Sequence, residues 1–312
     1  MVNGEKNLQP LTSNLGPRTR SLEPPMPSVI VNADDFGLSP GVNKAVIRGW
    51  REGILTSASL MASGDAFQEA VTLARETPAL QVGLHLTLVQ GRSVLPPAEI
   101  PGLVDGTGNF TDNPVLAGVR YFFLKGLRRQ LRNEIEAQLR KVRDAGISLS
   151  HVDGHLNIQM QPVVFDILME LAPLYGITTF RLTRERLTPL LLADGERVLG
   201  KRVDAFIFDR LAARGHPHLK RRGMRCTDEV KGLLNSGRMT KEYLLQLLDE
   251  LHPGSTELYF HPGCLPCAGI TRRMPDYRHE EELAALVSPA VIRKVKEKGI
   301  RLMNYRGEEK TV

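Results

Sequence analysis

Short apolar runs alternate along this chain with longer segments in which apolar residues recur every three or four positions. The short runs predict β-strands, and the longer segments predict amphipathic helices. The predicted strands lie near residues 28–33, 55–62, 80–88, 147–152, 178–183, 256–261 and 300–304. The first predicted helix begins at Ser39, and the others cover residues 65–75, 127–145, 162–175, 241–251 and 288–298. Because strands and helices alternate, the pattern favours an α/β fold with parallel strands.

About seven strands alternating with helices fit a single (β/α) barrel better than an open sheet, although periodicity alone leaves closure undecided. We expect one barrel domain over residues 28–305. Residues 1–27 are polar and lack the apolar core of a secretory signal, so they predict a disordered tail, and residues 306–312 predict a C-terminal tail. Residues 90–114 and the basic stretch 184–228 interrupt the pattern and predict long loops suited to substrate selection.

Composition narrows the class of protein. The chain has 312 residues, of which 42% are hydrophobic, enough for a substantial core. No apolar run approaches the roughly 18 residues that span a membrane, which predicts a cytoplasmic protein. The three cysteines do not build a disulfide framework; a zinc site at Cys264 and Cys267 is the minor alternative to two reduced cysteines in a loop. The net charge of +6 favours anionic partners. No nucleic-acid-binding motif accompanies the charge, so a non-catalytic nucleic-acid-binding protein is only the remote alternative.

Three motifs carry the candidate chemistry, and each lies beside a short apolar run. They are Asn-Ala-Asp-Asp-Phe-Gly at 32–37, Gly-Leu-His at 83–85 and His-Val-Asp-Gly-His at 151–155. Carboxylates and imidazoles at the ends of separate strands converge on one point in an α/β fold. Two carboxylates with two or more histidines there predict a divalent metal site with a general base beside it.

These motifs, in this order, resemble the YdjC-like family of metal-dependent carbohydrate N-deacetylases. The resemblance runs from about Val29 to about Arg301. Stretches at 118–124, 236–240 and 277–280 resemble one branch of the family, the deacetylase associated with hopanoid lipid biosynthesis. The resemblance implies a distorted TIM-like barrel, whose chemistry gathers at the C-terminal ends of the strands.

The resemblance also implies roles for single residues. It implies three metal ligands, which are Asp35, His85 and His155. Asp34 matches the family's base. His261 matches a late His-Pro element and is the candidate acid, because amide hydrolysis must protonate the departing amine.

Three further residues are expected to support these groups. His151 is expected to contact substrate or to lie behind the ligands, and Asp153 to orient an imidazole. Arg181 ends a predicted strand and is expected to hold Asp34 ionised by its charge. Asn157 stands where the family often has a histidine, which puts any substrate contact or proton relay through that position in doubt.

The expected function is removal of the N-acetyl group from a sugar with one divalent ion, either Mg²⁺ or Zn²⁺. The N-acetylglucosaminyl headgroup of a hopanoid lipid is the leading substrate, and a soluble chito-oligosaccharide or diacetyl sugar is the alternative. Another metal hydrolase, such as a phosphoesterase, and formation of a homo-oligomer both stay open.

A lipid substrate raises the question of membrane contact. Residues 121–124 are aromatic and apolar, and basic residues follow at Lys125, Arg128, Arg129 and Arg132. This composition is typical of an interfacial segment, which with the 184–228 loop predicts peripheral contact with the inner membrane face. The alternative is that residues 121–124 plug the barrel while the arginines face solvent.

Overall fold

The computed structural model describes residues 26–312 except 194, 267–269 and 271–273. The predicted N-terminal tail therefore lies almost entirely outside the described residues, and so does Cys267 of the Cys264–Cys267 pair. Among the described cysteines, Cys226 and Cys264 are free thiols. No described helix combines the length and the hydrophobicity needed to cross a bilayer.

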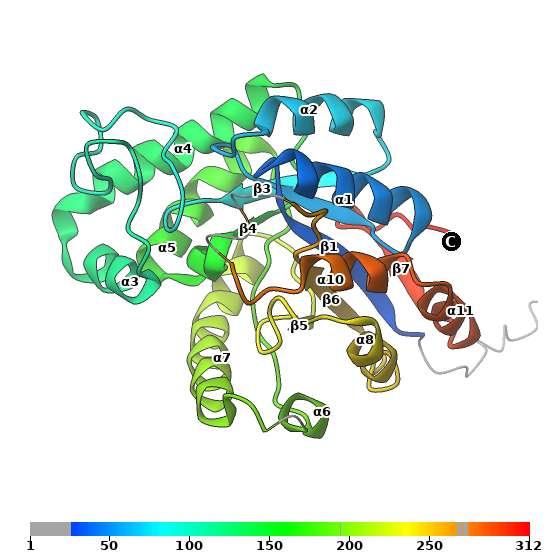
Figure 1. Cartoon of the computed structure of the whole chain (residues 1–312). Coiled ribbons are helices and arrows are strands. Elements are labelled where there is room, and N and C mark those ends of the chain that lie inside the picture. The colour runs from blue at the N-terminus through cyan, green and yellow to red at the C-terminus, as the bar shows by residue number, and fades with distance from the viewer. Residues whose placement is uncertain (1–25, 194, 267–269, 271–273) are drawn as a thin grey trace, which may run out of the picture.

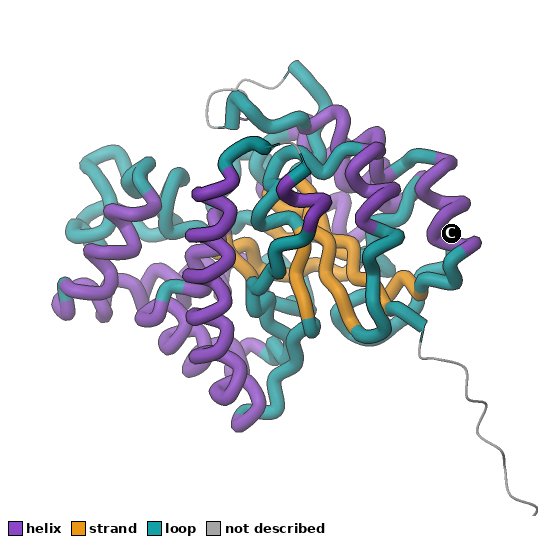
Figure 2. Tube along the Cα trace, turned by 90° about the horizontal axis from the view of Figure 1, so that it is seen from below, coloured by secondary structure: helices purple, strands orange, loops and turns teal. Residues whose placement is uncertain are grey.

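Seven parallel strands form one curled sheet in the centre of the protein (Figures 1 and 2). Its strand order is β4-β3-β2-β1-β6-β5, and β7 also pairs with β1. Strand β1 accommodates three neighbours because β7 pairs with residues 28–30 while β2 pairs from Asn32 onward. The strands are β1 Ser28–Phe36, β2 Ser57–Leu60, β3 Gln81–Leu86, β4 Val152–Gly154, β5 Glu229–Lys231, β6 Ser255–Phe260 and β7 Arg301–Met303.

Helices surround the sheet, and most of them bury an apolar face against it (Figure 2). They are α1 Pro40–Glu52, α2 Phe67–Glu76, α3 Pro114–Phe123, α4 Arg128–Asp144, α5 Pro162–Leu171, α6 Pro189–Leu192, α7 Val198–Arg221, α8 Lys241–Leu247, α10 His279–Leu286 and α11 Pro289–Glu297. Capping side chains determine where several of these helices begin. The Ser39 side chain accepts a hydrogen bond from Val42 N at the start of α1, and Pro40 occupies its first turn.

The complete barrel that the sequence predicts is only partly realised. The two ends of the sheet, β4 and β5, do not pair with each other. Between them runs the segment predicted as a strand at 178–183, which makes only isolated bridges, Phe180 to Val152 and Thr179 to Arg225. Single bridges leave most of the segment's backbone outside a ladder, so the sheet is a curled, partial barrel.

Other elements depart from the sequence prediction. Strand β4 begins at Val152, at the end of the predicted range 147–152. The predicted 184–228 loop is mostly helical, because α6 and the 24-residue helix α7 fall within it. The last residues pack onto the domain, since the Lys310 ammonium donates hydrogen bonds to the carbonyls of Trp50, Gly53 and Leu55.

Candidate active site

A bulge near the C-terminal end of β1 brings two neighbouring carboxylates to one site. Successive side chains on a regular strand point to opposite faces. Here Asp35 adopts a left-handed backbone conformation with φ of 64°, and the register with β2 shifts between Ala33 and Phe36. A bulge re-aims side chains in this way. The change of direction thus lies inside the strand.

Asp35, His85 and His155 form a compact, buried cluster at the C-terminal edge of the sheet. Each offers one ligand atom, and the three atoms lie within 4.8 Å of one another. His155 Nδ1 lies 3.0 Å from Asp35 Oδ1, and His85 Nε2 lies 3.3 Å from the same oxygen. Within the described part of the chain, Asp35 Oδ2 and His85 Nε2 have no hydrogen-bond partner. A divalent cation satisfies such unpaired buried atoms, so this donor set fits a metal.

The electrostatics of the cluster favour positive charge. Burial lowers the pKa of His85, but the nearby carboxylates of Asp153 and Asp34 raise it to about 10. For Asp35 burial acts in the opposite direction and raises the pKa. The charges and hydrogen bonds of His155 and His85 outweigh it and hold the pKa of Asp35 well below its usual value. The surrounding carboxylates therefore stabilise a cation at this point, whether it is a proton on His85 or a metal ion.

Asp153 orients His85 from behind. Its Oδ1 accepts a hydrogen bond from His85 Nδ1 at 2.8 Å, which leaves Nε2 facing Asp35. Its Oδ2 accepts from the Ser59 hydroxyl at 2.6 Å. This is the carboxylate–histidine arrangement that fixes the orientation of metal-bound imidazoles. The expectation that Asp153 orients an imidazole agrees with this geometry.

His151 lies in a layer behind the cluster. Its ring stacks on Tyr305 with centroids 3.6 Å apart, and its two nitrogens lie within hydrogen-bond distance of the Ser59 and Ser150 hydroxyls. Burial lowers the pKa of His151 to about 3, so the imidazole is neutral. Gly83 is required beside it, because a Cβ there would lie 2.4 Å from the His151 ring.

Arg181 joins three carboxylates from three different strands. Its guanidinium donates two hydrogen bonds of 2.7 Å to Asp34, one to each oxygen. It also pairs with Asp153 at 2.8 Å and donates from Nε to Glu257 at 2.6 Å. The predicted pairing of Arg181 with Asp34 is thus present, in bidentate geometry.

Glu257 is a member of this network that sequence reasoning missed. It lies on β6, is completely buried, and has a pKa that burial raises to about 7 against the opposing charge of Arg181. The signal was available, because Glu257 is the one charged residue within the otherwise uncharged strand Ser255–Phe260. A charged residue inside a buried strand needs a partner, and here that partner is Arg181.

His261 follows β6 and lies close enough to Asp35 and Asp34 for their charges to act on its imidazole. Its backbone N–H donates to Glu282, and its carbonyl accepts a hydrogen bond from His279 Nδ1. Its own Nδ1 has no hydrogen-bond partner among the described residues and lies 4.0 Å from the Glu282 carboxylate. Burial lowers the pKa of His261 to about 4, although Asp35 and Asp34 raise it in part. His261 is therefore neutral near pH 7.

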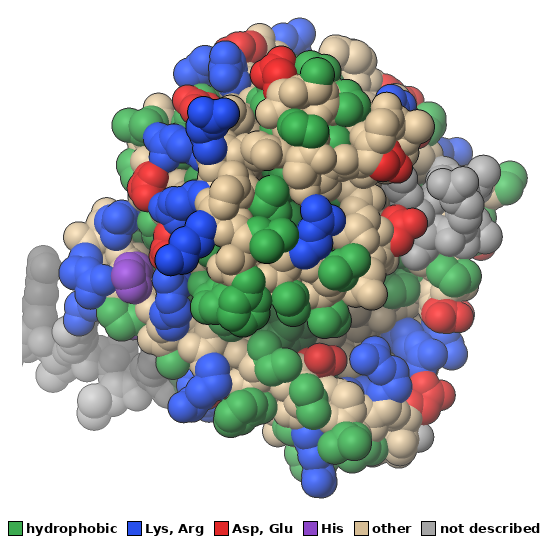
Figure 3. All heavy atoms as spheres, turned by 90° about the vertical axis from the view of Figure 1, so that its left-hand side faces the viewer, with side chains coloured by type: hydrophobic (Ala, Val, Ile, Leu, Met, Phe, Trp, Pro, Cys, Tyr) green, Lys and Arg blue, Asp and Glu red, His purple; other side chains and the backbone are tan. Residues whose placement is uncertain are grey.

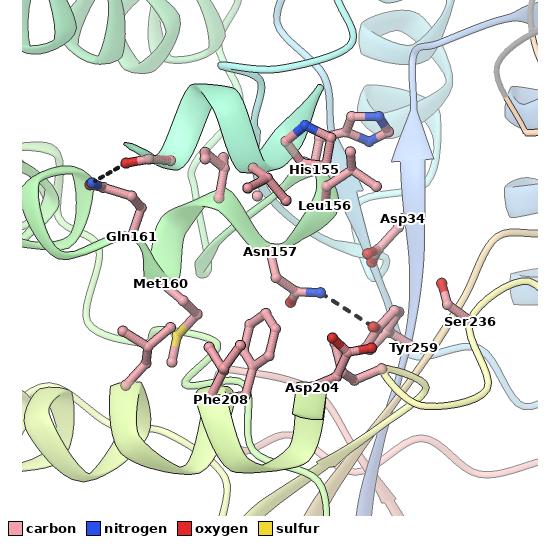
Figure 4. A pocket seen from close by; sticks show the side chains of 18 of the residues that line it. Asp34, His155, Leu156, Asn157, Met160, Gln161, Asp204, Phe208, Ser236 and Tyr259 are labelled. Carbon is pink, nitrogen blue, oxygen red and sulfur yellow. Dashed lines mark hydrogen bonds between the residues drawn. The ribbon is translucent and has the colours of Figure 1, made fainter. Parts of the chain in front are cut away.

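A cavity of about 790 Å³ opens beside the cluster. Its polar end contains Asp34, His155 and His261, while Asp35, His85 and Arg181 lie outside the lining. Figure 4 shows Asp34 and His155 at this end and Asn157 turned toward Tyr259. The other end is mostly apolar and is lined by side chains of α3 and α7, among them Val115, Val119, Phe122, Ile207, Phe208 and Leu211. Two charged residues, Arg197 at the start of α7 and Asp204 within it, also line the cavity.

Asn157 holds its place in the cavity wall through polar contacts. It accepts a hydrogen bond of 2.7 Å from the Thr183 hydroxyl, and its amide lies 3.4 Å from the Tyr259 hydroxyl. Both Leu156 and Asn157 have left-handed backbone conformations. Asn157 thus contributes a polar group to the cavity lining.

Comparison with known proteins identifies the family. Residues 28–297 match the model of the YdjC-like protein family. The chain belongs to the YdjC-like family. It is 30% identical over 279 residues to a carbohydrate deacetylase of Geobacillus stearothermophilus, covering 89% of this chain and 96% of that protein. It is 31% identical over 283 residues to a carbohydrate deacetylase of Thermoanaerobacter pseudethanolicus, covering 90% and 98%.

A solved structure supports the same fold. The protein from Enterococcus faecalis, described as a cellobiose-phosphate cleavage protein, superposes on this YdjC-like chain with a TM-score of 0.69. The two are 25% identical, and the match covers 90% of this chain and 98% of that one. The curled parallel sheet is therefore shared with a solved relative.

The ion network around Arg181 generates a stability prediction. Arg181→Met leaves the carboxylates of Asp34, Asp153 and Glu257 buried without their partner, so we expect unfolding free energy to fall by about 3–5 kcal/mol. Arg214→Met is the control, because it removes a partly exposed pair with Asp166 and a cation–π contact with Phe165, which together should cost no more than about 2 kcal/mol.

Denaturant unfolding of the two variants and of Arg181→Lys measures the difference. Arg181→Lys keeps the positive charge but loses the planar set of N–H donors. Its unfolding free energy should therefore lie between those of the wild type and Arg181→Met. Equal midpoints for Arg181→Met and Arg214→Met would show that the buried carboxylates do not depend on the guanidinium.

Proposed function

We propose that this protein is a metal-dependent carbohydrate deacetylase that hydrolyses the N-acetyl group of a sugar. The observation that carries the proposal is the buried Asp35–His85–His155 cluster beside Asp34, at the polar end of a large cavity. Relatives that align over about nine-tenths of the chain are carbohydrate deacetylases, which supports this assignment. The three clustered residues would hold one divalent ion.

Asp34 is suited to act as the general base. It lines the cavity, adjoins a residue of the cluster, and is held in one orientation by Arg181 and by the Asn32 amide at 2.8 Å. A bound divalent ion would lower the pKa of a coordinated water and polarise the acetamide carbonyl. Asp34 would then accept a proton from the attacking water.

His261 is the candidate acid for the departing amine. Its pKa of about 4 means that it enters the reaction neutral, so the proton that the attacking water releases to Asp34 would have to pass to His261 before the amine departs. Once protonated, an imidazolium with so low a pKa gives its proton readily to an amine. Asp34 and His261 both line the polar end of the cavity, as a base and an acid acting on one bond require.

We infer that the sugar is attached to an apolar group, with the N-acetylglucosaminyl headgroup of a hopanoid lipid as the leading substrate. The cavity supports this inference, because its polar end is continuous with an apolar end between α3 and α7. A free chito-oligosaccharide or diacetyl sugar, the alternative, would leave that apolar end without a partner.

Acetate release from a substrate panel tests the function. We expect release from a glycosylated hopanoid and slower release from di-N-acetylchitobiose, because only the lipid fills the apolar end of the cavity. Faster release from chitobiose would favour the soluble-sugar alternative. Release of phosphate from a phosphorylated sugar, with no acetate from any substrate, would contradict the deacetylase assignment.

The ligand set predicts how metal content depends on single residues. We expect about one divalent ion per chain by elemental mass spectrometry, as a cluster of three protein ligands implies. His85→Ala and His155→Ala should lose the ion, whereas His252→Ala, a change at an exposed histidine, should retain it. Chelation should abolish acetate release, and Mg²⁺ or Zn²⁺ should restore it. Full occupancy in both cluster variants would eliminate this ligand set.

The two catalytic assignments predict loss of turnover without loss of metal. Asp34→Asn should lower turnover on the order of 10²-fold or more, the usual range for removal of a general base. His261→Ala should lower turnover with the ion retained. The surface change Asp166→Asn serves as the control and should leave both quantities unchanged. Near-normal activity of Asp34→Asn would exclude Asp34 as the base, and loss of the ion from His261→Ala would make His261 a ligand.

A further inference from the structure

An apolar surface surrounds the open end of the cavity. On α3 and the residue after it, and on α7, large apolar side chains point into solvent, and Val115, Phe123, Leu199 and Phe206 are 65–77% exposed. We call this surface the α3–α7 face. Its exposed members are Val115, Leu116, Val119, Phe122, Phe123, Leu124, Leu199, Val203, Phe206 and Ile207. So large a group of exposed apolar side chains marks an interaction surface rather than ordinary scatter.

The structure changes how residues 121–124 are understood. Tyr121 is buried and donates a hydrogen bond of 2.6 Å to Leu88 O, so it anchors α3 to the domain. Phe122, Phe123 and Leu124 are about half or more exposed, and the two phenylalanine rings contact each other edge to face. Only Tyr121 is thus a core residue, and the segment does not plug the barrel.

Positive charge borders the α3–α7 face. Residues 113–132 contain five basic residues and no acidic one. Arg128 and Arg132 pair with Glu170, but Lys125 and Arg129 are exposed and form no ion pair with any residue that the structure describes. Figure 3 shows apolar side chains on this side of the molecule beside a column of lysine and arginine side chains. Apolar side chains next to unpaired cations match the boundary of an anionic lipid bilayer.

Charge also distinguishes a bilayer from a second copy of the chain. In a twofold dimer the same surface meets itself, so Lys125 and Arg129 of both copies would lie in one interface. Like charges brought together in this way repel and disfavour the dimer. An anionic bilayer instead neutralises these cations while its acyl region receives the exposed apolar side chains.

We propose that the α3–α7 face docks this protein on anionic bilayers, with the mouth of the cavity turned toward the lipid. Val115, Phe122 and Ile207 both line the cavity and belong to the face, so the docking surface continues into the binding site. In this orientation the apolar part of a glycolipid enters between α3 and α7, and its sugar reaches Asp34 and His155. That last step rests on the proposed function, whereas docking itself does not.

Vesicle binding tests docking without any substrate. We expect the protein to sediment with vesicles of phosphatidylglycerol and phosphatidylethanolamine at about 0.05 M salt, and to be released at about 0.5 M salt. Phosphatidylcholine vesicles should bind it at least about tenfold more weakly. Absence of binding to the anionic vesicles at low salt overturns the proposal.

Two double variants separate the electrostatic and apolar contributions. Lys125→Glu/Arg129→Glu reverses the unpaired charges, and Leu124→Ser/Phe206→Ser removes exposed apolar groups that do not line the cavity. Each should weaken binding to the anionic vesicles about tenfold or more. The matched controls are Arg293→Glu/Lys296→Glu on α11, on the far side of the molecule from α3, and Leu174→Ser, a leucine that is 70% exposed elsewhere (Figure 1). Equal loss in variants and controls overturns the assignment of this face.

Activity measurements separate failure of docking from failure of the proposed function. Both face variants should release acetate from di-N-acetylchitobiose at the wild-type rate but lose activity on a glycosylated hopanoid embedded in anionic vesicles. If the wild type binds vesicles but releases no acetate, docking stands and the deacetylase assignment falls. If the protein is a dimer that dissociates in the face variants and ignores vesicles, the face is an interface between copies and docking is wrong.

Discussion

The site depends on the buried ion network around Arg181. Its guanidinium, 1% exposed, joins carboxylates on β1, β4 and β6, so it connects strands from both halves of the sheet. A buried network of this kind adds little net stability, because desolvation cancels most of the attraction. Its effect is on geometry, since a planar fork with five fixed donors allows Asp34 and Asp153 few alternative orientations.

This network couples the candidate base to the candidate ligands. Arg181 contacts Asp34 on one side and Asp153 on the other, and Asp153 in turn orients His85. A displacement of Asp34 would therefore disturb the Asp35–His85–His155 cluster as well. The same guanidinium also explains how Glu257 can be buried, because the Glu257 carboxylate accepts a hydrogen bond from Arg181 Nε. Positioning by such fixed, water-excluded groups is the main way in which hydrolytic sites gain rate.

For the candidate site, the sequence predicted which residues lie close together better than it predicted how they are arranged. Apolar runs ending in Asp, His or Arg located the residues, because the C-terminal ends of parallel strands meet at one edge. The bulge at Asp35 was not predictable, since it depends on the pairing of β1 with β2. Helix α7 was missed because its apolar residues, such as Val203 and Phe206, face solvent instead of forming a stripe toward the core. The segment at 178–183 has the composition of a strand, but its partners meet it only at single bridges.

One short segment connects the two ends of the cavity. The 3-10 segment His155–Met160 begins with a residue of the Asp35–His85–His155 cluster and ends with a side chain in the apolar lining of the cavity. Leu156 and Asn157 within it have left-handed, non-helical backbone conformations. Asn adopts this region readily, but for Leu156 it costs about 1–3 kcal/mol and persists only when surrounding contacts fix it. Those contacts include Asn157 with Thr183 and His155 with Asp35. The strain therefore lies where the backbone passes from the polar end of the cavity to its apolar end within six residues.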